Sequence, residues 1–176
     1  MHLRPATAAD AAAIRDIYAP IVRDTTISFE AEPPDADEIR RRMRAGTVRL
    51  PWLVAETERG IAGFAYAAPF RTRPAYRWSV ETSVYLARSA RRRGTGRTLY
   101  QRLLTDLHEL GYVTAYAGIA LPNEASVRLH EALGFAPVGV FPAAGYKLRR
   151  WVDVGWWALA LRVAPAAPDQ PLAWQA

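Results

Sequence analysis

Residues 91–97 read RRRGTGR, so arginines stand on both sides of two glycines, directly before a run with helical spacing. The first amides of a helix lack intrahelical partners, and the helix dipole places partial positive charge beside them. Glycines let the main chain turn sharply and approach a ligand closely. The segment therefore predicts a site for a phosphate or pyrophosphate, although an ordinary loop with a solvated basic face would contain the same residues.

Two familiar nucleotide-binding patterns do not fit this segment. A P-loop requires Gly-Lys-Ser/Thr after its glycines, and none follows here. The Rossmann fingerprint requires a third glycine and an acidic residue at the end of the next strand. The predicted anion site therefore belongs to another strand–loop–helix arrangement.

Two further residues have side chains suited to proton transfer. Glu81 lies in SVETSVYL, a mostly apolar run in which a carboxylate costs free energy unless it has a partner or a water. His130 lies in the helical run NEASVRLHEALG, and an imidazole serves as acid or base near neutral pH. An outward-facing glutamate in a salt bridge and a structural histidine are the alternative interpretations.

The composition is that of one globular domain. The chain has 176 residues, of which 51% are hydrophobic and 23% are charged. The lack of cysteine excludes disulfides, thiolate catalysis and cysteine-ligated zinc, and the three histidines are too far apart in sequence to indicate a metal site. No apolar run reaches membrane-spanning length and the N-terminus has no signal core, so we expect a soluble cytoplasmic protein.

The formal net charge of +6 comes from arginines that cluster at 40–44, 91–97 and 149–150. Basic surfaces attract the phosphates of nucleic acids or of cofactors. A nucleic-acid-binding module would place its arginines along one groove-sized face. The sequence carries no helix-turn-helix, zinc or aromatic RNA-binding signature, so we expect no nucleic acid partner.

An alternation of strands and helices must position these residues. Runs of β-type residues predict strands over 2–6, 52–56, 61–67, 79–86, 113–120, 135–140 and 151–161. Helical spacing and caps predict one helix after Thr7, one from Asp35 to Gly46, one that ends at Gly111 and one over 123–134. This pattern indicates the α+β class. The proline- and alanine-rich tail, residues 164–176, is expected to lie over the surface or to fray.

Two motifs resemble those of a known family. SVYLARSARRRGTGRTLYQRLL is similar to the acyl-coenzyme-A-binding segment of the GCN5-related N-acetyltransferases, a strand followed by R/Q-x-x-G-x-G/A and a helix. LPNEASVRLHEALGF resembles the next family motif, an asparagine before a short helix that closes on Gly-Phe. Their order and spacing are more specific than either motif alone.

The likeness extends over residues 3–161. TISFEAEPP, VETSVYL and AAGYKLRRWVDVGWW are similar to the phosphinothricin and methionine sulfoximine N-acetyltransferase subfamily. The resemblance implies a single domain over 1–163, with a mixed, mostly antiparallel twisted sheet between helices in an α/β/α sandwich, the acyl-CoA N-acyltransferase fold. It also implies a homodimer formed through the region of Trp151, Trp156 and Trp157. Packing in the core is the simpler explanation for these three tryptophans.

The resemblance assigns the acetyl-coenzyme A contacts residue by residue. We expect no metal. The main chain of Val84, Tyr85 and Leu86 would pair with the pantetheine arm, and one of its amides would polarise the thioester carbonyl. Asn123 would contact the same arm and also suits a helix N-cap. The pyrophosphate would be held, mainly through amides, by Arg92, Arg93, Gly94, Thr95, Gly96 and Arg97.

The resemblance also assigns catalytic and substrate roles. Glu81 would be the general base that removes the amine proton, directly or through water, with its pKa raised by partial burial. His130 stands where the wider superfamily has a tyrosine that protonates the leaving thiolate, and it would act either as acid or as an aid to Glu81. A wall at Phe29 and donors for substrate oxygens are implied at Arg71, Arg73 and Tyr76; a solvated basic loop is the alternative for the arginines.

We therefore expect an acetyl-coenzyme-A-dependent N-acetyltransferase that acts on a small amino acid such as phosphinothricin, methionine sulfoximine or methionine sulfone. The amine would attack the thioester directly in a ternary complex, because no cysteine is present to carry an acyl group. The same chemistry on a protein N-terminus or an antibiotic, a coenzyme-A-binding protein without activity, and a basic nucleic-acid-binding module are the alternatives.

Overall fold

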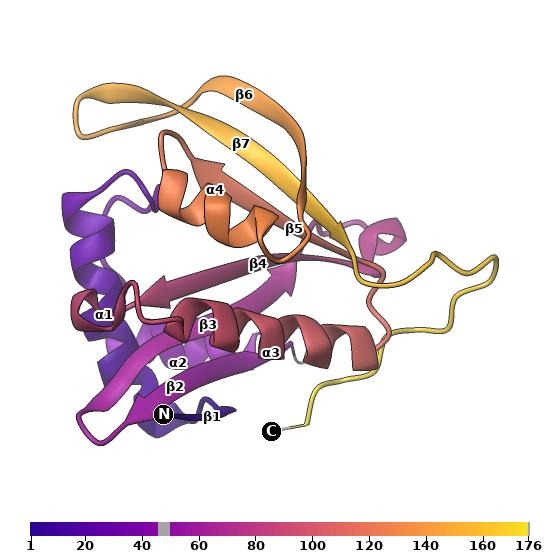
Figure 1. The fold of residues 1–176 in the computed structure, drawn as a ribbon, viewed down its shortest axis with the longest axis horizontal. Helices are drawn as coiled ribbons and strands as arrows, with labels where there is room; N and C mark the ends of the chain where they lie inside the picture. Colours follow the sequence, from indigo (N-terminus) through magenta and orange to yellow (C-terminus); the bar gives the residue numbers. More distant parts are fainter. Residues whose placement is uncertain (46–49, 176) are drawn as a thin grey trace.

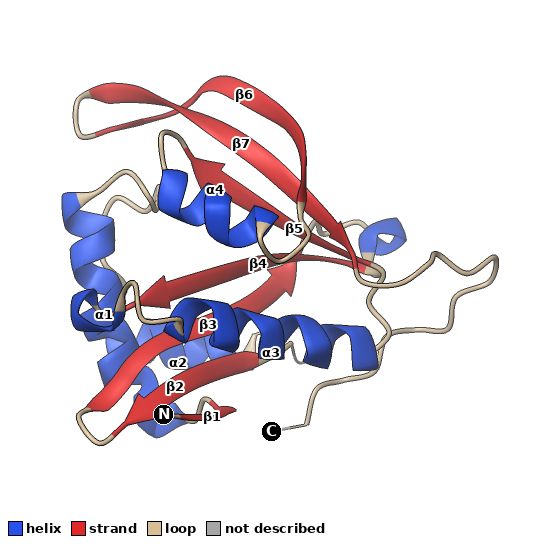
Figure 2. Cartoon of the chain, viewed as in Figure 1, coloured by secondary structure: helices blue, strands red, loops and turns tan. Residues whose placement is uncertain are grey.

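The computed structural model describes residues 1–45 and 50–175. Its strands are β1 (His2–Pro5), β2 (Trp52–Thr57), β3 (Gly60–Pro69), β4 (Ser79–Leu86), β5 (Thr114–Ala120), β6 (Ala136–Lys147) and β7 (Arg150–Ala160). Its α-helices are α1 (Ala11–Asp24), α2 (Ala36–Arg44), α3 (Thr95–Glu109) and α4 (Glu124–Glu131). Figure 1 shows α3 and α4 in front of the sheet and α2 behind it, and Figure 2 shows the same layers by type. The predicted sandwich is confirmed.

The strands form one sheet in the order β1-β2-β3-β4-β5-β7-β6. All neighbouring strands run antiparallel except β4 and β5, which are parallel. The β4–β5 pairing is short: it ends at the pair formed by Glu81 and Tyr116. Beyond that pair β4 stays with β3 and β5 stays with β7, so the two central strands diverge.

Each face of the sheet has its own hydrophobic cluster. On one face Leu99, Leu103 and Leu107, spaced by one helical turn along α3, are fully buried against the central strands. On the other face α1 and α2 bury Ile14 and Ile39 against β2 and β3. Burying one such side chain contributes roughly 1.5–3 kcal/mol, so the two clusters hold the helices on the sheet.

The hairpin of β6 and β7 is longer than the sequence patterns indicate. The predicted strand over 135–140 continues as β6 to Lys147. Most β6 side chains are exposed, so the strand does not alternate between buried and exposed positions. The period-two pattern of apolar and polar residues that predicts a strand is therefore missing from the extension. The turn uses Leu148 and Arg149 at φ of 50° and 62°, a conformation that sequence patterns associate with Asn and Gly.

The other predicted elements are found within a few residues of their expected bounds. Helix α2 is capped by the Asp35 side chain, which accepts from the Glu38 amide. The predicted helix stop at Gly46 lies outside the described residues. In the described part of the chain, no helix has the length and apolar character needed to cross a bilayer.

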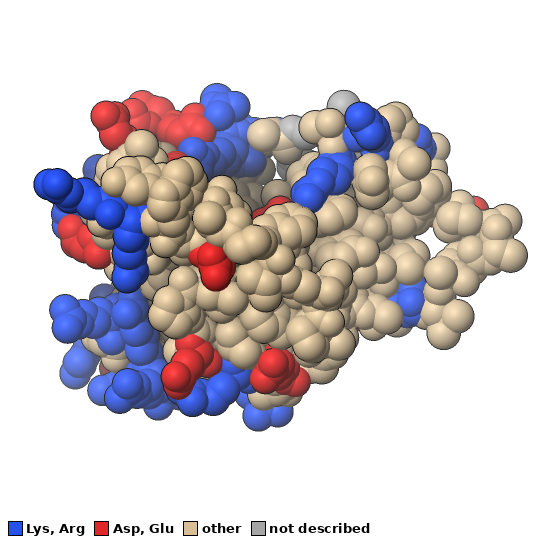
Figure 3. Space-filling view, turned by 90° about the horizontal axis from the view of Figure 1, so that it is seen from above, with Lys and Arg blue, Asp and Glu red and all other residues tan. Residues whose placement is uncertain are grey.

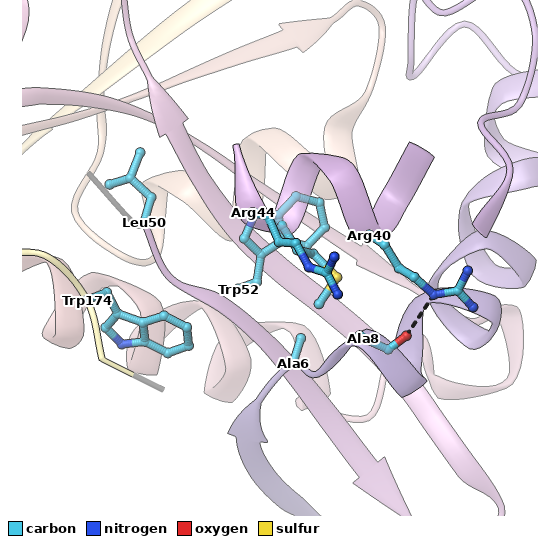
Figure 4. Close-up of a pocket in the computed structure, with 8 residues that line it drawn as sticks. Ala6, Ala8, Arg40, Arg44, Leu50, Trp52 and Trp174 are labelled. Atoms are coloured by element: carbon cyan, nitrogen blue, oxygen red, sulfur yellow. Dashed lines mark hydrogen bonds between the residues drawn. The ribbon is translucent and has the colours of Figure 1, made fainter. Parts of the chain in front are cut away.

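The C-terminal tail lies over the surface of the domain. The Trp78 indole donates to the Asp169 carbonyl at 2.8 Å, and the Leu172 amide donates to the Leu110 carbonyl at 2.8 Å. Figure 4 shows Trp174 near Leu50 beside a hollow of about 180 Å³ that α2 and β2 also line. None of the predicted site residues lines this hollow.

Candidate active site

The predicted anion site is a strand–loop–helix turn between β4 and α3. Gly94 has φ of 81° and precedes the first residue of α3, Thr95. The amide of Thr98 donates to the Gly94 carbonyl at 3.1 Å, so the amides of Thr95, Gly96 and Arg97 belong to the unpaired first turn. The side chains of Arg92, Arg93 and Arg97 are exposed around this turn. The arrangement offers oriented amides and positive charge to an anion.

The two glycines of this turn are required for different reasons. A Cβ on Gly94 would meet no atom within 4 Å, so the left-handed φ of 81° is what favours glycine there. A Cβ on Gly96 would lie 3.1 Å from Cδ1 of Leu86. Gly96 therefore lets the start of α3 approach the end of β4, and its missing side chain faces the protein rather than the expected pyrophosphate.

The divergence of β4 and β5 leaves one edge of β4 without a strand partner after Glu81. An extended ligand can pair with such an edge through main-chain hydrogen bonds. A small cavity of about 50 Å³ lies in this opening. Its lining brings together four of the predicted residues, Val84, Tyr85, Asn123 and His130, with Ile27, Thr82, Ser83, Gly118, Ile119, Ala120 and Ser126. We call this opening the strand cleft.

Asn123 has the cap role expected of it and stands at the strand cleft. Its side-chain oxygen accepts from the Ser126 amide at 3.2 Å, which begins α4. The side-chain NH₂ of Asn123 thus remains available as a donor toward a ligand. The capping interpretation and the binding interpretation are compatible at this residue.

Glu81 lies at the point where the strands diverge. Its side chain is half-buried, and this burial raises its pKa, while the nearby positive charge of Arg71 opposes the shift. A raised pKa suits a group that accepts a proton near neutral pH. The salt-bridge alternative is wrong, because none of the ion pairs among the described residues includes Glu81.

An aromatic wall stands beside Glu81. Phe70 stacks on Tyr116 with ring centroids 4.2 Å apart and meets the Trp156 ring edge-on at 5.9 Å. The guanidinium carbon of Arg71 lies 4.0 Å from the Phe70 ring centroid, and Tyr76 meets the same ring at 5.9 Å. Sequence reasoning named Arg71 and Tyr76 as site residues but did not place Phe70, Tyr116 or Trp156 beside them.

The other two residues predicted to bind substrate, Arg73 and Phe29, are not part of the aromatic wall. Arg73 joins Arg71 and Tyr76 along a cavity of about 460 Å³ that the tail closes at Gln170 and Pro171. Phe29 contacts the β6–β7 hairpin instead, since a Cβ on Gly145 would fall 2.4 Å from its ring. The same loop sends Ile27 to the strand cleft. The Lys147 ammonium donates to the Ser28 carbonyl of this loop at 2.6 Å. No sequence pattern predicted this contact.

His130 is buried on α4, and both of its ring nitrogens have partners. Nδ1 lies 2.8 Å from the Ser126 carbonyl oxygen, and Nε2 lies 3.0 Å from the Tyr100 hydroxyl. Burial lowers the pKa of His130, and the bond to Ser126 opposes this shift. No hydrogen bond joins His130 to Glu81 within the described residues. Tyr100 sits inside the leucine stripe of α3, where sequence patterns predict only core packing, so its hydroxyl contact could not be predicted.

The arginine clusters differ in their surroundings. On α2, Arg41 pairs with Glu38, and Arg42 pairs with both Glu30 and Glu38 at 2.7 Å. This cluster is therefore largely neutralised within the fold. Figure 3 shows basic side chains gathered at one end of the molecule, near α1 and the start of α3, with acidic side chains among them. On the face seen in Figure 3, basic and acidic side chains are therefore mixed.

A family model described as "Acetyltransferase (GNAT) domain" matches residues 3–156. The chain belongs to the GNAT acetyltransferase family. The acetyltransferase is 44% identical over 173 residues to a phosphinothricin N-acetyltransferase of Streptomyces viridochromogenes, covering 98% of this chain and 94% of that protein. It is 35% identical over 170 residues to a methionine sulfoximine/methionine sulfone acetyltransferase of Salmonella typhimurium, covering 96% and 99% of the two chains.

A solved structure gives the same result for the fold. The phosphinothricin acetyltransferase of Sinorhizobium meliloti, in complex with acetyl-coenzyme A, superimposes with a TM-score of 0.89 and 37% identity, covering 96% of this acetyltransferase and 92% of that chain. The predicted family, the acyl-CoA N-acyltransferase fold and the enzyme class are therefore confirmed. The roles of the individual site residues stay predictions.

Proposed function

We propose that this acetyltransferase moves an acetyl group from acetyl-coenzyme A to the α-amino group of a small amino acid of the phosphinothricin, methionine sulfoximine or methionine sulfone kind. One observation carries the proposal: the parallel strands separate directly after Glu81, with Arg71 and an aromatic wall at the same point. The names of the relatives support this substrate class.

The residues fit acetyl-coenzyme A in two places. The amides of Thr95, Gly96 and Arg97 would hold the pyrophosphate, with the neighbouring arginines adding charge. The open edge of β4, from Val84 to Leu86, would pair with the pantetheine arm. A main-chain amide of this edge would then donate to the thioester oxygen, where negative charge develops during attack.

Glu81 is the proposed proton acceptor. The amine nitrogen forms a bond to the thioester carbon, and its proton passes to the Glu81 carboxylate, directly or through one water. The carbon–sulfur bond then breaks, and the thiolate takes up a proton. His130 lines the strand cleft, which Glu81 does not line, and it is proposed to assist this exchange from the thiolate side. No residue carries the acetyl group between the two substrates.

The substrate would lie against the aromatic wall. Phe70, Tyr116 and Trp156 offer apolar surface for a side chain that carries a methyl group. Arg71 lies over that wall, and a guanidinium binds a carboxylate through two parallel hydrogen bonds. Arg73 and Tyr76 are proposed to bind the second set of oxygens, on the phosphinate or sulfone.

A substrate panel tests the proposal. Thiol release from acetyl-coenzyme A should be fast with phosphinothricin, methionine sulfoximine and methionine sulfone, and slow with a peptide amine or an aminoglycoside. Arg71→Ala should raise KM for the amino acids much more than KM for acetyl-coenzyme A, with Arg59→Ala, on the β2–β3 turn, as the matched control. Faster thiol release with the peptide or the aminoglycoside would mean that the enzyme acetylates a different class of amine by the same reaction.

The homodimer and the cytoplasmic location are proposals as well. Large apolar side chains are exposed together on the β6–β7 hairpin: Val138, Val140, Phe141, Tyr146 and Trp151. Patches of this kind usually mark interaction surfaces, and a second copy of the chain is the proposed partner. The cysteine-free composition suits a reducing compartment.

A further inference from the structure

A continuous chain of hydrogen bonds runs from α4 to β5 behind the strand cleft. It starts at the Ser126 carbonyl and His130 Nδ1, at 2.8 Å, and continues from Nε2 to the Tyr100 hydroxyl at 3.0 Å. The Tyr100 hydroxyl lies 2.6 Å from Thr82 Oγ1, and Thr82 Oγ1 lies 3.2 Å from the Tyr116 carbonyl, a second acceptor for the Thr82 hydroxyl. The side chains in the middle are buried, with exposures of 4% for His130, 0% for Tyr100 and 3% for Thr82.

Both ends of the chain are carbonyl oxygens, which can only accept. Nδ1 of His130 must therefore carry a hydrogen, so a neutral ring keeps Nε2 as an acceptor. The Tyr100 hydroxyl then donates to Nε2, and Thr82 donates to Tyr100. Every donor of the three side chains has a partner in this state.

A protonated ring reverses the direction of the hydroxyls. Nε2–H then donates to the Tyr100 oxygen, Tyr100 donates to Thr82 Oγ1, and Thr82 donates to the Tyr116 carbonyl. The two hydroxyl groups rotate and no covalent bond other than the new N–H is formed. Because Tyr116 is the register partner of Glu81, the chain ends at the point where the strands diverge.

We propose that Tyr100 and Thr82 are positioning residues that fix the tautomer of His130 and let its buried ring accept a proton without losing a hydrogen bond. When the ring is charged, the Thr82 hydroxyl donates to the Tyr116 carbonyl. When the ring is neutral, Thr82 donates to Tyr100 instead, and the Tyr116 carbonyl does not receive this bond. The role in acetyl transfer rests on the proposed function, whereas the tautomer and the proton affinity do not.

The other groups around the ring do not supply this function. Phe135 packs against both Tyr100 and His130 and is apolar. Glu81 precedes Thr82 on β4, so its side chain points to the opposite face of the sheet. On α4 itself, Arg128 pairs with exposed Glu124, and Glu131 accepts from the Trp157 indole. Thr82 and Tyr100 are therefore the groups through which the ring's charge is accommodated.

The two replacements of Thr82 separate this role from simple packing. Thr82→Val keeps the shape but leaves the Tyr100 hydroxyl without an acceptor when the ring is charged, while the neutral state keeps its Tyr100–His130 bond. Thr82→Ser restores the hydroxyl. The readout is the ¹⁵N chemical shift of both His130 nitrogens against pH, in the free enzyme, with the signal assigned by its loss in His130→Gln.

The wild-type enzyme should show a neutral ring with hydrogen on Nδ1 at about pH 8. Thr82→Val should lower the pKa of His130 by about one unit, a tenfold loss of proton affinity, and Thr82→Ser should keep the wild-type value. Tyr100→Phe should also lower it; if that variant does not fold, the Thr82 pair decides. A hydrogen on Nε2 in the neutral wild type, or equal values in the Val and Ser variants, would overturn the proposal.

The same variants distinguish this proposal from the proposed function. If His130 takes part in acetyl transfer, one limb of the kcat/KM profile should move with the pKa of its ring in Thr82→Val. An unmoved profile beside a shifted pKa would remove His130 from the reaction and leave the hydrogen-bond chain intact.

Discussion

The half-buried position of Glu81 costs stability, and the proposed role of this residue as proton acceptor would use the same raised pKa. Its burial raises its pKa in the folded state above the ordinary glutamate value. A group of this kind contributes its full share of stability below the unfolded pKa of about 4.3, and that share is lost as the pH rises through the folded pKa. The proposed acceptor of the amine proton is therefore held in a place that disfavours its charge.

Glu81→Gln should separate the two effects. Turnover should fall by roughly 10²–10⁴-fold because the proton acceptor is gone, while acetyl-coenzyme A affinity stays the same. Thermal unfolding should show a higher Tm than the wild type at pH 8 and the same Tm at pH 4, because only the ionised carboxylate is penalised. Wild-type turnover across pH would remove Glu81 from the mechanism.

Asp10 shows the opposite behaviour. Its carboxylate accepts two bonds from Arg4 at 2.8 Å and one from the Thr7 amide at 2.7 Å. The bond to Arg4 is the main cause that lowers the pKa of Asp10 to about 2. This stability is present above the unfolded pKa and is lost as the pH falls toward 2.

Asp10→Asn should therefore lower the free energy of unfolding by about 2 kcal/mol at pH 7, and the difference should shrink as the pH falls from about 4 to 2. Urea titration at several pH values measures it. Asp16→Asn is the matched control, since its carboxylate is exposed beside Arg15 and should change little. An equal loss at pH 2 and pH 7 would mean that the ion pair is not the cause.

At the scale of elements, α3 and β4 form one unit. The turn at Gly94 presents the first amides of the helix, and the missing side chain of Gly96 brings the helix against Leu86. A larger residue at position 96 would push against Leu86 and separate the two halves of the proposed cofactor site. The backbone edge and the helix amides must keep this spacing to hold one extended ligand.

Gly96→Ala should weaken acetyl-coenzyme A binding, and Leu86→Ala in the same chain should restore part of the affinity. Isothermal calorimetry measures both. Gly60→Ala is a control for Gly94→Ala, because both glycines have positive φ and open space beyond Cα. Gly60→Ala and Gly94→Ala should both lose stability, but only Gly94→Ala should lose acetyl-coenzyme A affinity. Unchanged affinity in Gly96→Ala would show that the helix and strand spacing does not matter.

Several elements could be predicted from the sequence because their signals are local. The glycine and arginine spacing indicated the turn before α3, and the apolar spacing indicated the helices. Thr82 and Tyr100 gave no signal, because their contact joins a strand and a helix that are separate in the sequence. The extension of β6 gave none either, since its exposed side chains carry no alternation, and the left-handed turn at Leu148 and Arg149 lacks glycine.

At the scale of the whole molecule, the β6–β7 hairpin exposes large apolar side chains that a monomer would leave in contact with water. Trp151 is 67% exposed and packs on Tyr146, which is 62% exposed, with ring centroids 5.3 Å apart. Lys147 ties the same hairpin to the loop that carries Ile27 toward the strand cleft. An interface formed here would therefore lie beside the loop that lines the strand cleft.

Trp151→Lys should convert the proposed dimer into a monomer, because a buried ammonium without a partner is costly at an apolar interface. Light scattering during size exclusion gives the mass. Val163→Lys is the control, since Val163 is 92% exposed and lies outside the hairpin. A monomeric wild-type enzyme at all tested concentrations would exclude the hairpin as a dimer surface.

The diverging strands and the start of α3 are proposed to hold acetyl-coenzyme A beside Glu81. A crystal structure of the enzyme with acetyl-coenzyme A and methionine sulfone tests it most directly. The pyrophosphate should contact the amides of Thr95, Gly96 and Arg97, the pantetheine arm should follow β4, and the amine should face Glu81. A cofactor bound elsewhere, with the strand cleft closed by protein side chains, would contradict the account.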